Sequence, residues 1–176
     1  MFISAAKFGD KNDFDWLVER YQSTLSEDEA FRILLALPSV GNSDNLNSIF
    51  NLTVQNYFEE TDLSTFYSIL SLRHPNETWQ FYKSNFERIL ELYPNHAYSI
   101  LVAIANNFAT LELSNSFQKF LVDKKIPLTH QISLTLQLVT NNVRWSSNRS
   151  SEVSLWLSLW NSKRNKIKKI KSIIFN

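Results

Sequence analysis

Three histidines are the first candidates for a catalytic metal site. His74, His96 and His130 are the only histidines in the sequence, and they stand 22 and 34 residues apart. A zinc site needs three protein ligands that converge on one ion, and a helix can supply two of them when two histidines stand four residues apart. These spacings provide no such pair, and cysteine is absent. We therefore expect neither a metal-ligand set nor a cofactor in this chain.

Two clusters of carboxylates could in principle supply a general acid and a general base. Glu59, Glu60 and Asp62 form one cluster, and residues 27–29 form the other. Each cluster lies at or before the start of an expected helix, where negative charge is favourable because it faces the positive end of the helix dipole. No serine stands in a Gly-x-Ser-x-Gly elbow, and the two isolated glycines form no phosphate-binding loop. We therefore predict no catalytic residue, and no enzymatic activity for this chain alone.

The composition indicates one folded helical domain. The chain has 176 residues, of which 44% are hydrophobic, with only two glycines and four prolines. Folds built from strands and turns usually need more glycine and proline than this. The first residues lack the basic stretch and apolar run of a signal peptide, so we expect a cytoplasmic location. A secretory or membrane-associated location is the alternative if the chain belongs to a longer protein.

Apolar residues recur with helical spacing along the whole chain. Phe14, Leu17, Val18 and Tyr21 stand at i, i+3, i+4 and i+7, and therefore share one helix face. Further expected helices start at or near Ser26, Leu46, Asp62, Trp79, Ala97, Ser114, Thr129 and Ser151.

Two local patterns sharpen these boundaries. Ser26 and Glu29 have the spacing of a capping box, and the stripe that starts at Trp79 predicts a single helix up to Tyr93, before Pro94. The spacing of about ten helices in pairs predicts an all-α fold, a HEAT- or armadillo-like solenoid of helical hairpins. A globular bundle is the alternative, because periodicity does not separate the two.

Several segments carry a resemblance to a known family. Two stand near the start, Ala5–Asp10 (AAKFGD) and Phe14–Tyr21 (FDWLVERY), and Ser26–Leu37 and Trp79–Phe86 follow in the same order. The segment NVRW, which ends at Trp145, and the following EVSLWL are similar to the closing signature of that family. Together they resemble the C-terminal helical domain of zinc aminopeptidases of the aminopeptidase N type, which include the endoplasmic-reticulum aminopeptidases. The resemblance covers roughly residues 2–160, so we take 1–160 as an aminopeptidase C-terminal-like domain.

The resemblance implies a role without catalysis. In that family an upstream domain holds the zinc through a His-Glu-x-x-His helix and a further Glu, and a Gly-Ala-Met-Glu-Asn segment binds the substrate N-terminus. This sequence contains neither motif. The C-terminal domain is implied to cap the catalytic cleft, with its concave face in contact with peptide. Arg144 and Arg149 are weak candidates for a contact with a peptide carboxylate.

Four tryptophans belong to the segments that match, and we expect them to be structural. Trp16, Trp79, Trp145 and Trp156 all stand at helical spacing among other apolar residues. Large aromatic side chains in such stripes are usually core residues. We therefore predict that all four lie in the structural core.

Residues 161–176 form a basic amphipathic tail that could also be a final helix. This tail holds six Lys or Arg and no acid, whereas all 17 Asp and Glu precede it. If it is a final helix, its isoleucines pack on the preceding helices and its lysines face water. The alternatives are contact with an anionic membrane or a partner protein, and nucleic acid is the least favoured partner.

Three hypotheses about function remain open at this stage. The first is a non-catalytic domain that binds or positions peptide or protein. The second is a fragment of a zinc aminopeptidase whose catalytic domain lies elsewhere, and the third is an unrelated helical-repeat scaffold. Phe2, Ile3 and Phe8 also predict an apolar N-terminal edge, through which the chain docks on a catalytic aminopeptidase domain or on a second copy.

Overall fold

The structure is a computed structural model of the whole chain, and it describes residues 1–149 and 151–161. Within them the α-helices are α1 (Phe2–Phe8), α2 (Lys11–Ser23), α3 (Glu27–Ala36), α4 (Ser43–Thr53), α5 (Leu63–Arg73), α6 (Pro75–Ser84), α7 (Phe86–Leu92), α8 (Ala97–Ala105), α9 (Leu111–Asp123) and α10 (His130–Asn148). Short 3-10 turns lie at Leu37–Ser39 and Glu60–Asp62, and residues 151–161 form a further helix. The prediction of an all-α fold is confirmed.

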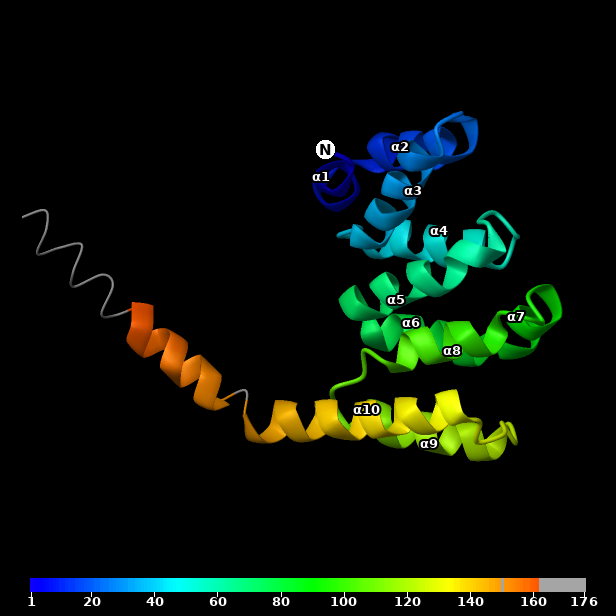
Figure 1. Cartoon of the computed structure of the whole chain (residues 1–176). Helices are drawn as coiled ribbons and strands as arrows, with labels where there is room; N and C mark the ends of the chain where they lie inside the picture. The colour runs from blue at the N-terminus through cyan, green and yellow to red at the C-terminus, as the bar shows by residue number, and fades with distance from the viewer. Residues whose placement is uncertain (150, 162–176) are drawn as a thin grey trace, which may run out of the picture.

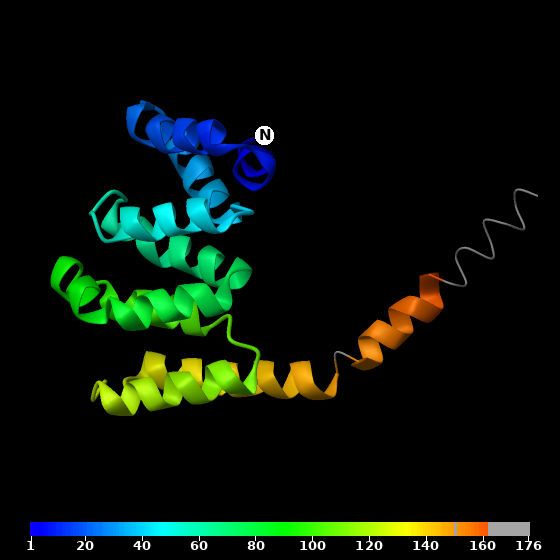
Figure 2. The same cartoon turned by 180° about the vertical axis from the view of Figure 1, so that it is seen from behind.

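The helices stack one layer after another from the N-terminus towards α10 (Figures 1 and 2). Five of them, α1, α3, α5, α8 and α10, contact one another in that order and form a continuous row. The other helices pack beside this row, for example α2 on α3, α6 on α5 and α9 on α10. This arrangement creates a long face made of α5, α8 and α10. The HEAT- or armadillo-like character of the repeat stays a prediction.

The core follows the apolar stripes that the sequence displays. Leu17, Ile33, Phe66, Ile100 and Phe117 are among the side chains with no exposed surface. They belong to one cluster that runs from α1 to α10. Isolated helices shorter than about 12–15 residues are only marginally stable in water, and most helices here are that short, so burial of these stripes holds the stack together.

The helix starts confirm some expected caps and correct others. Thr129 accepts a hydrogen bond from the backbone N–H of Ile132, as expected for the residue that opens α10. Ser26 caps α3 in the same way, but the capping box is only half formed, because Glu29 binds Arg20 at 2.8 Å instead. An ion pair with a neighbouring helix has replaced the local contact.

Two further helix starts differ in detail from the expectation. The helix α5 begins directly after Asp62, as expected, but the Asp62 side chain forms no cap. The helix α9 is capped by Thr110 rather than by Ser114. Ser114 is buried inside α9, where apolar residues around it face the core. The helix begins at Leu111, about one turn before the expected start.

The single helix expected from Trp79 to Tyr93 is wrong, because it is two helices that meet at Asn85. The side-chain amide of Asn85 donates to the backbone oxygen of Phe81 at 2.9 Å, and its own N–H donates to the same oxygen at 3.0 Å. Such local bonds from asparagine compete with helical ones. The chain therefore turns, and the apolar stripe continues on α7.

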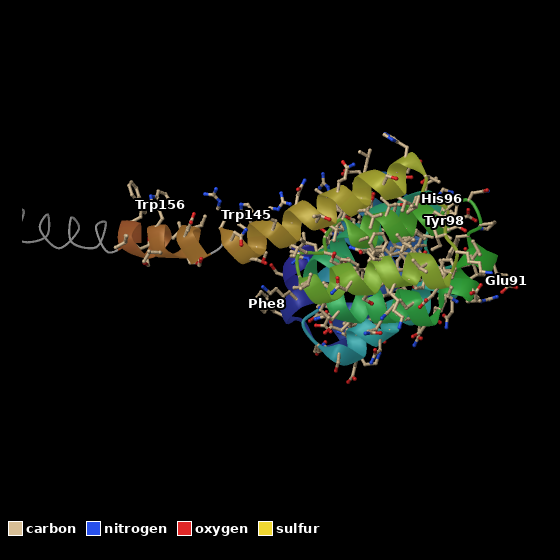
Figure 3. The ribbon with its side chains drawn as sticks, turned by 90° about the horizontal axis from the view of Figure 1, so that it is seen from below. Phe8, Glu91, His96, Tyr98, Trp145 and Trp156 are labelled. Atoms are coloured by element: carbon tan, nitrogen blue, oxygen red, sulfur yellow. The ribbon has the colours of Figure 1, made fainter. Side chains whose placement is uncertain are left out.

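The expected burial of four tryptophans is correct for Trp79 alone. Trp79 is 1% exposed, whereas Trp16, Trp145 and Trp156 are 48%, 57% and 59% exposed. Trp145 lies on the end of α10 that projects from the body, and Trp156 lies beyond it (Figure 3). Their stripes are apolar but no further layer of helices covers them within the described residues. The final helix expected for residues 161–176 stays a prediction, because residues 162–176 lie outside the part of the chain that the structure describes.

Candidate functional site

An open hollow of about 400 Å³ with a mixed polar and apolar lining lies between α5 and α8, next to the start of α10. Its polar lining consists of Ser64, Thr65, Ser68, Ser99, Asn106 and Gln131. Val102, Ala103 and Ile69 supply the apolar part of the lining. Every one of these side chains is uncharged, so the hollow offers hydrogen bonds and contact area rather than a charge. We call it the hydroxyl groove.

A second hollow of about 370 Å³ adjoins the first, because Val102 and Gln131 line both. Its wall is mainly apolar and contains Tyr98, Ile126, Pro127 and Ile132, with His130 at the start of α10. Figure 3 shows Tyr98 beside His96, at the end of the molecule away from Trp145 and Trp156. We call this second hollow the aromatic pocket. The hydroxyl groove therefore continues into a site that suits an apolar side chain.

Side-chain hydrogen bonds across the helix junctions hold the hydroxyl groove in shape. Ser64 Oγ and Ser99 Oγ lie 2.9 Å apart and join α5 to α8. The amide of Asn107 donates to the backbone oxygen of Ser68 at 2.9 Å, and that of Asn142 donates to the oxygen of Asn106 at 3.1 Å. The last bond joins α8 to α10. Because the small side chains let α5 and α8 lie close together, the groove is part of the scaffold rather than a loop.

The serines of the groove are not arranged as nucleophiles. Ser99 Oγ donates to the backbone oxygen of His96 at 2.8 Å, so it does not contact the imidazole that would have to remove its proton. The imidazole faces Glu60 instead, with Nε2 and Oε2 3.7 Å apart. Such an arrangement can bind a ligand but gives no activated hydroxyl. Neither His96 nor Glu60 lines the groove.

The structure does not bring the expected site residues together. Arg144 and Arg149 are exposed near the end of α10, far along the helix from the groove that begins at Gln131. Arg149 forms an exposed ion pair with Glu152, with Nη1 and Oε2 3.4 Å apart. Among the described residues, no three His, Cys, Asp or Glu lie close enough to hold a metal ion. The three histidines thus stay on separate helix ends.

The groove residues were missed by the sequence reasoning, although one signal was available. Ser64 and Ser68, and likewise Ser99 and Ala103, stand four residues apart on helix faces opposite to the apolar stripes. Small residues at this spacing allow two helices to pack closely and leave space above them. The sequence alone does not say that α5 and α8 lie side by side, so the two pairs could not be combined into one site.

One comparison with known proteins gives a clear result. The family described as the ERAP1-like C-terminal domain matches residues 1–144. The matched region contains all of α1 to α9 and most of α10, including the hydroxyl groove and the aromatic pocket. No curated protein sequence matches the chain. No helix among the described residues is both long enough and apolar enough to cross a membrane.

Proposed function

The chain belongs to the ERAP1-like C-terminal domain family of aminopeptidases, and from this we infer that it is a non-catalytic module that binds or positions peptide. The observation that carries the inference is the hydroxyl groove, which continues into the aromatic pocket on the row of α5, α8 and α10. The family match removes the third hypothesis, an unrelated scaffold, because a match over residues 1–144 is not a chance similarity of helix spacing.

The chemistry of the face suits an extended peptide. Ser68, Asn106 and Gln131 offer donors and acceptors to peptide N–H and C=O groups, which must be satisfied when a peptide leaves water. The neighbouring Tyr98 and Ile126 offer apolar contact to one side chain. Hydrogen bonds to the main chain give affinity for many sequences, and the aromatic pocket gives a preference for an apolar residue at one position.

A tyrosine introduced at Thr65 is expected to block the groove. Thr65 lines the hollow and is exposed, so Thr65→Tyr fills the space without disturbing the core. We expect the Kd for a fluorescein-labelled pool of random peptides of about ten residues to rise at least about tenfold, which corresponds to ~1.4 kcal/mol. Fluorescence anisotropy measures the change.

Ser84→Tyr is the matched control for this experiment. Ser84 is exposed at the end of α6 and does not line the groove. The control is expected to bind the peptide pool as the parent chain does. Equal weakening by both substitutions, or binding that Thr65→Tyr leaves intact, would place the peptide elsewhere on the surface.

A second candidate is that the chain is one segment of a zinc aminopeptidase. The family match favours it, because in such enzymes this domain accompanies a separate catalytic domain. Under this proposal the groove positions the far end of a peptide whose N-terminus is cleaved elsewhere. A reading frame that continues upstream of Met1 and encodes His-Glu-x-x-His would support it. The cytoplasmic location expected from the sequence stays a prediction.

The N-terminal edge, which consists of the apolar side chains of Met1, Ile3, Phe8 and Trp16, is proposed as a protein-docking surface. Phe8 is 78% exposed and Ile3 50% exposed, while Phe2 packs against Trp16 with ring centroids 6.3 Å apart. Exposed apolar patches of this kind are typical of interaction sites. The candidate partners are a catalytic aminopeptidase domain and a second copy of the chain.

A charge placed at this edge is expected to abolish self-association. Sedimentation velocity of the parent chain should show dimers or larger species that increase with concentration, and Ile3→Glu with Phe8→Glu should give monomers because a buried unpaired charge is costly. Leu128→Glu, at an exposed residue beside α10, is the control and should associate as the parent does. A parent chain that stays monomeric over a wide concentration range would rule out the second copy as partner.

A further inference from the structure

The helix formed by residues 151–161 is the most exposed apolar element of the described chain. All of its residues are exposed, and the large apolar ones are between 42% and 63% exposed. Figures 1 and 2 show this helix beyond the end of α10, away from the stacked body. An apolar helix that meets only water is unfavourable, so a partner is expected to cover it.

The apolar side chains cover a wide sector of this helix. At 3.6 residues per turn, Val153, Leu155, Trp156, Leu157, Leu159 and Trp160 occupy roughly 200° of the circumference. Ser154 and Ser158 lie on the opposite side. The rings of Trp156 and Trp160 stack with centroids 5.9 Å apart and therefore present one aromatic surface. Tryptophan has an apolar ring and an N–H donor, and it favours the boundary between lipid chains and water.

The sequence next to this helix is strongly cationic. Residues 163–171 contain six Lys or Arg, and no acid follows Glu152. Glu152 itself lies 3.4 Å from Arg149, so its charge is offset. Packing of this end against the same end of a second copy would bring two positive segments together. A partner that is both apolar and anionic would cover the exposed apolar helix and also attract the cationic sequence next to it.

We propose that the helix 151–161, which we call the anchor helix, lies in the surface of an anionic lipid bilayer. Its apolar sector enters the boundary of the acyl chains, and the six positive charges that the sequence carries between residues 163 and 171 favour an anionic surface. Crossing a bilayer takes about 20 apolar residues, whereas the sequence after residue 161 carries six Lys or Arg within 163–171. The anchor helix therefore lies along the surface, and the stacked body with its hydroxyl groove stays in water. This proposal does not depend on peptide binding.

The test is co-sedimentation of the full chain with vesicles of phosphatidylcholine alone and of phosphatidylcholine with phosphatidylserine. We expect at least about tenfold stronger partition to the anionic vesicles, and loss of most of this difference at about 1 M salt, where the Debye length is ~3 Å. Trp156→Ser with Trp160→Ser is expected to lower partition by about tenfold or more. Lys168→Gln, Lys169→Gln and Lys171→Gln should lower it for the anionic vesicles alone.

Phe31→Ser is the matched control, because Phe31 is also an exposed aromatic residue but lies on α3, within the stacked body. It should partition as the parent does, and all variants should keep the parent thermal midpoint, because the changed residues lie outside the core. Equal binding to both vesicle types, or no loss in the Trp156 and Trp160 variant, would overturn the proposal. So would sedimentation data in which that variant converts a stable dimer to monomer without lipid, since a second copy would then cover the anchor helix.

Discussion

Replacing Trp79 with alanine is expected to lower the free energy of unfolding by about 3–5 kcal/mol. Trp79 is 1% exposed and lies where α6, α8 and α9 meet. The centroid of its ring lies 5.3 Å from the ring centroid of Phe108 and 5.2 Å from that of Phe120, and both pairs pack edge to face. The substitution leaves a large cavity among rings that cannot collapse to fill it. It also removes one of the two donors to Ser116 Oγ, the indole N–H at 2.9 Å, and leaves Lys83 Nζ at 3.3 Å.

A loss of this size is a large part of the stability of a typical domain, which is about 5–15 kcal/mol. We therefore expect the thermal midpoint to fall by roughly 6–20 °C. Urea unfolding followed by circular dichroism measures the change. Trp145→Ala removes the same side chain from a position that is 57% exposed, and is expected to cost less than about 1 kcal/mol. Equal losses at the two positions would mean that Trp145 is covered in solution.

The contrast between these two tryptophans marks the limit of the sequence prediction. Periodicity shows which face of a helix is apolar, and that was enough to predict the helices around Leu17, Ile33 and Ile132. It does not show whether a neighbouring helix covers that face. Trp79 has α9 against it, whereas the apolar stripe on the end of α10 continues past the last layer of the stack. The same pattern therefore gave a core residue in one place and a surface residue in the other.

The candidate site was harder to predict for a related reason. A catalytic site is recognised in a sequence by rare residues at fixed spacing, and this sequence contains no such motif. The sequence therefore predicts no catalytic residue. The hydroxyl groove is made of common residues such as Ser64, Ser99 and Gln131, which come from three helices. These residues form one site only because α5, α8 and α10 pack together. Arg144 and Arg149 were selected by charge instead, and charge says nothing about distance from the groove.

Alkaline pH is expected to unfold the protein through its buried tyrosines. The hydroxyl of Tyr67 donates to Thr53 Oγ1 at 2.9 Å, and that of Tyr82 donates to the backbone oxygen of Ala97 at 2.8 Å. Burial raises the pKa of Tyr67, and that of Tyr82, well above the ordinary value, because the phenolate would lose its hydration. The hydrogen bond to Thr53 lowers the pKa of Tyr67, but it offsets only part of the rise that burial causes.

The direction of the pH effect follows from these raised values. Above about pH 10 the unfolded chain releases the tyrosine protons, whereas the folded chain still holds them. The stability that these groups contribute is therefore fully present below the unfolded pKa, and it falls as the pH rises towards the folded pKa. Each tyrosine contributes a slope of about −1.4 kcal/mol per pH unit in this range.

Tyr67→Phe is the variant that tests this account. It removes one ionisable group and one buried hydrogen bond, so we expect it to be about 1 kcal/mol less stable than the parent at about pH 8. Its stability should then fall less steeply above about pH 10, by ~1.4 kcal/mol per pH unit, so that the difference from the parent shrinks or reverses by about pH 11. Urea unfolding at a series of pH values gives both slopes. Tyr98→Phe is the control, because Tyr98 is 40% exposed. A Tyr67→Phe slope equal to that of the parent would show that other groups drive the alkaline transition.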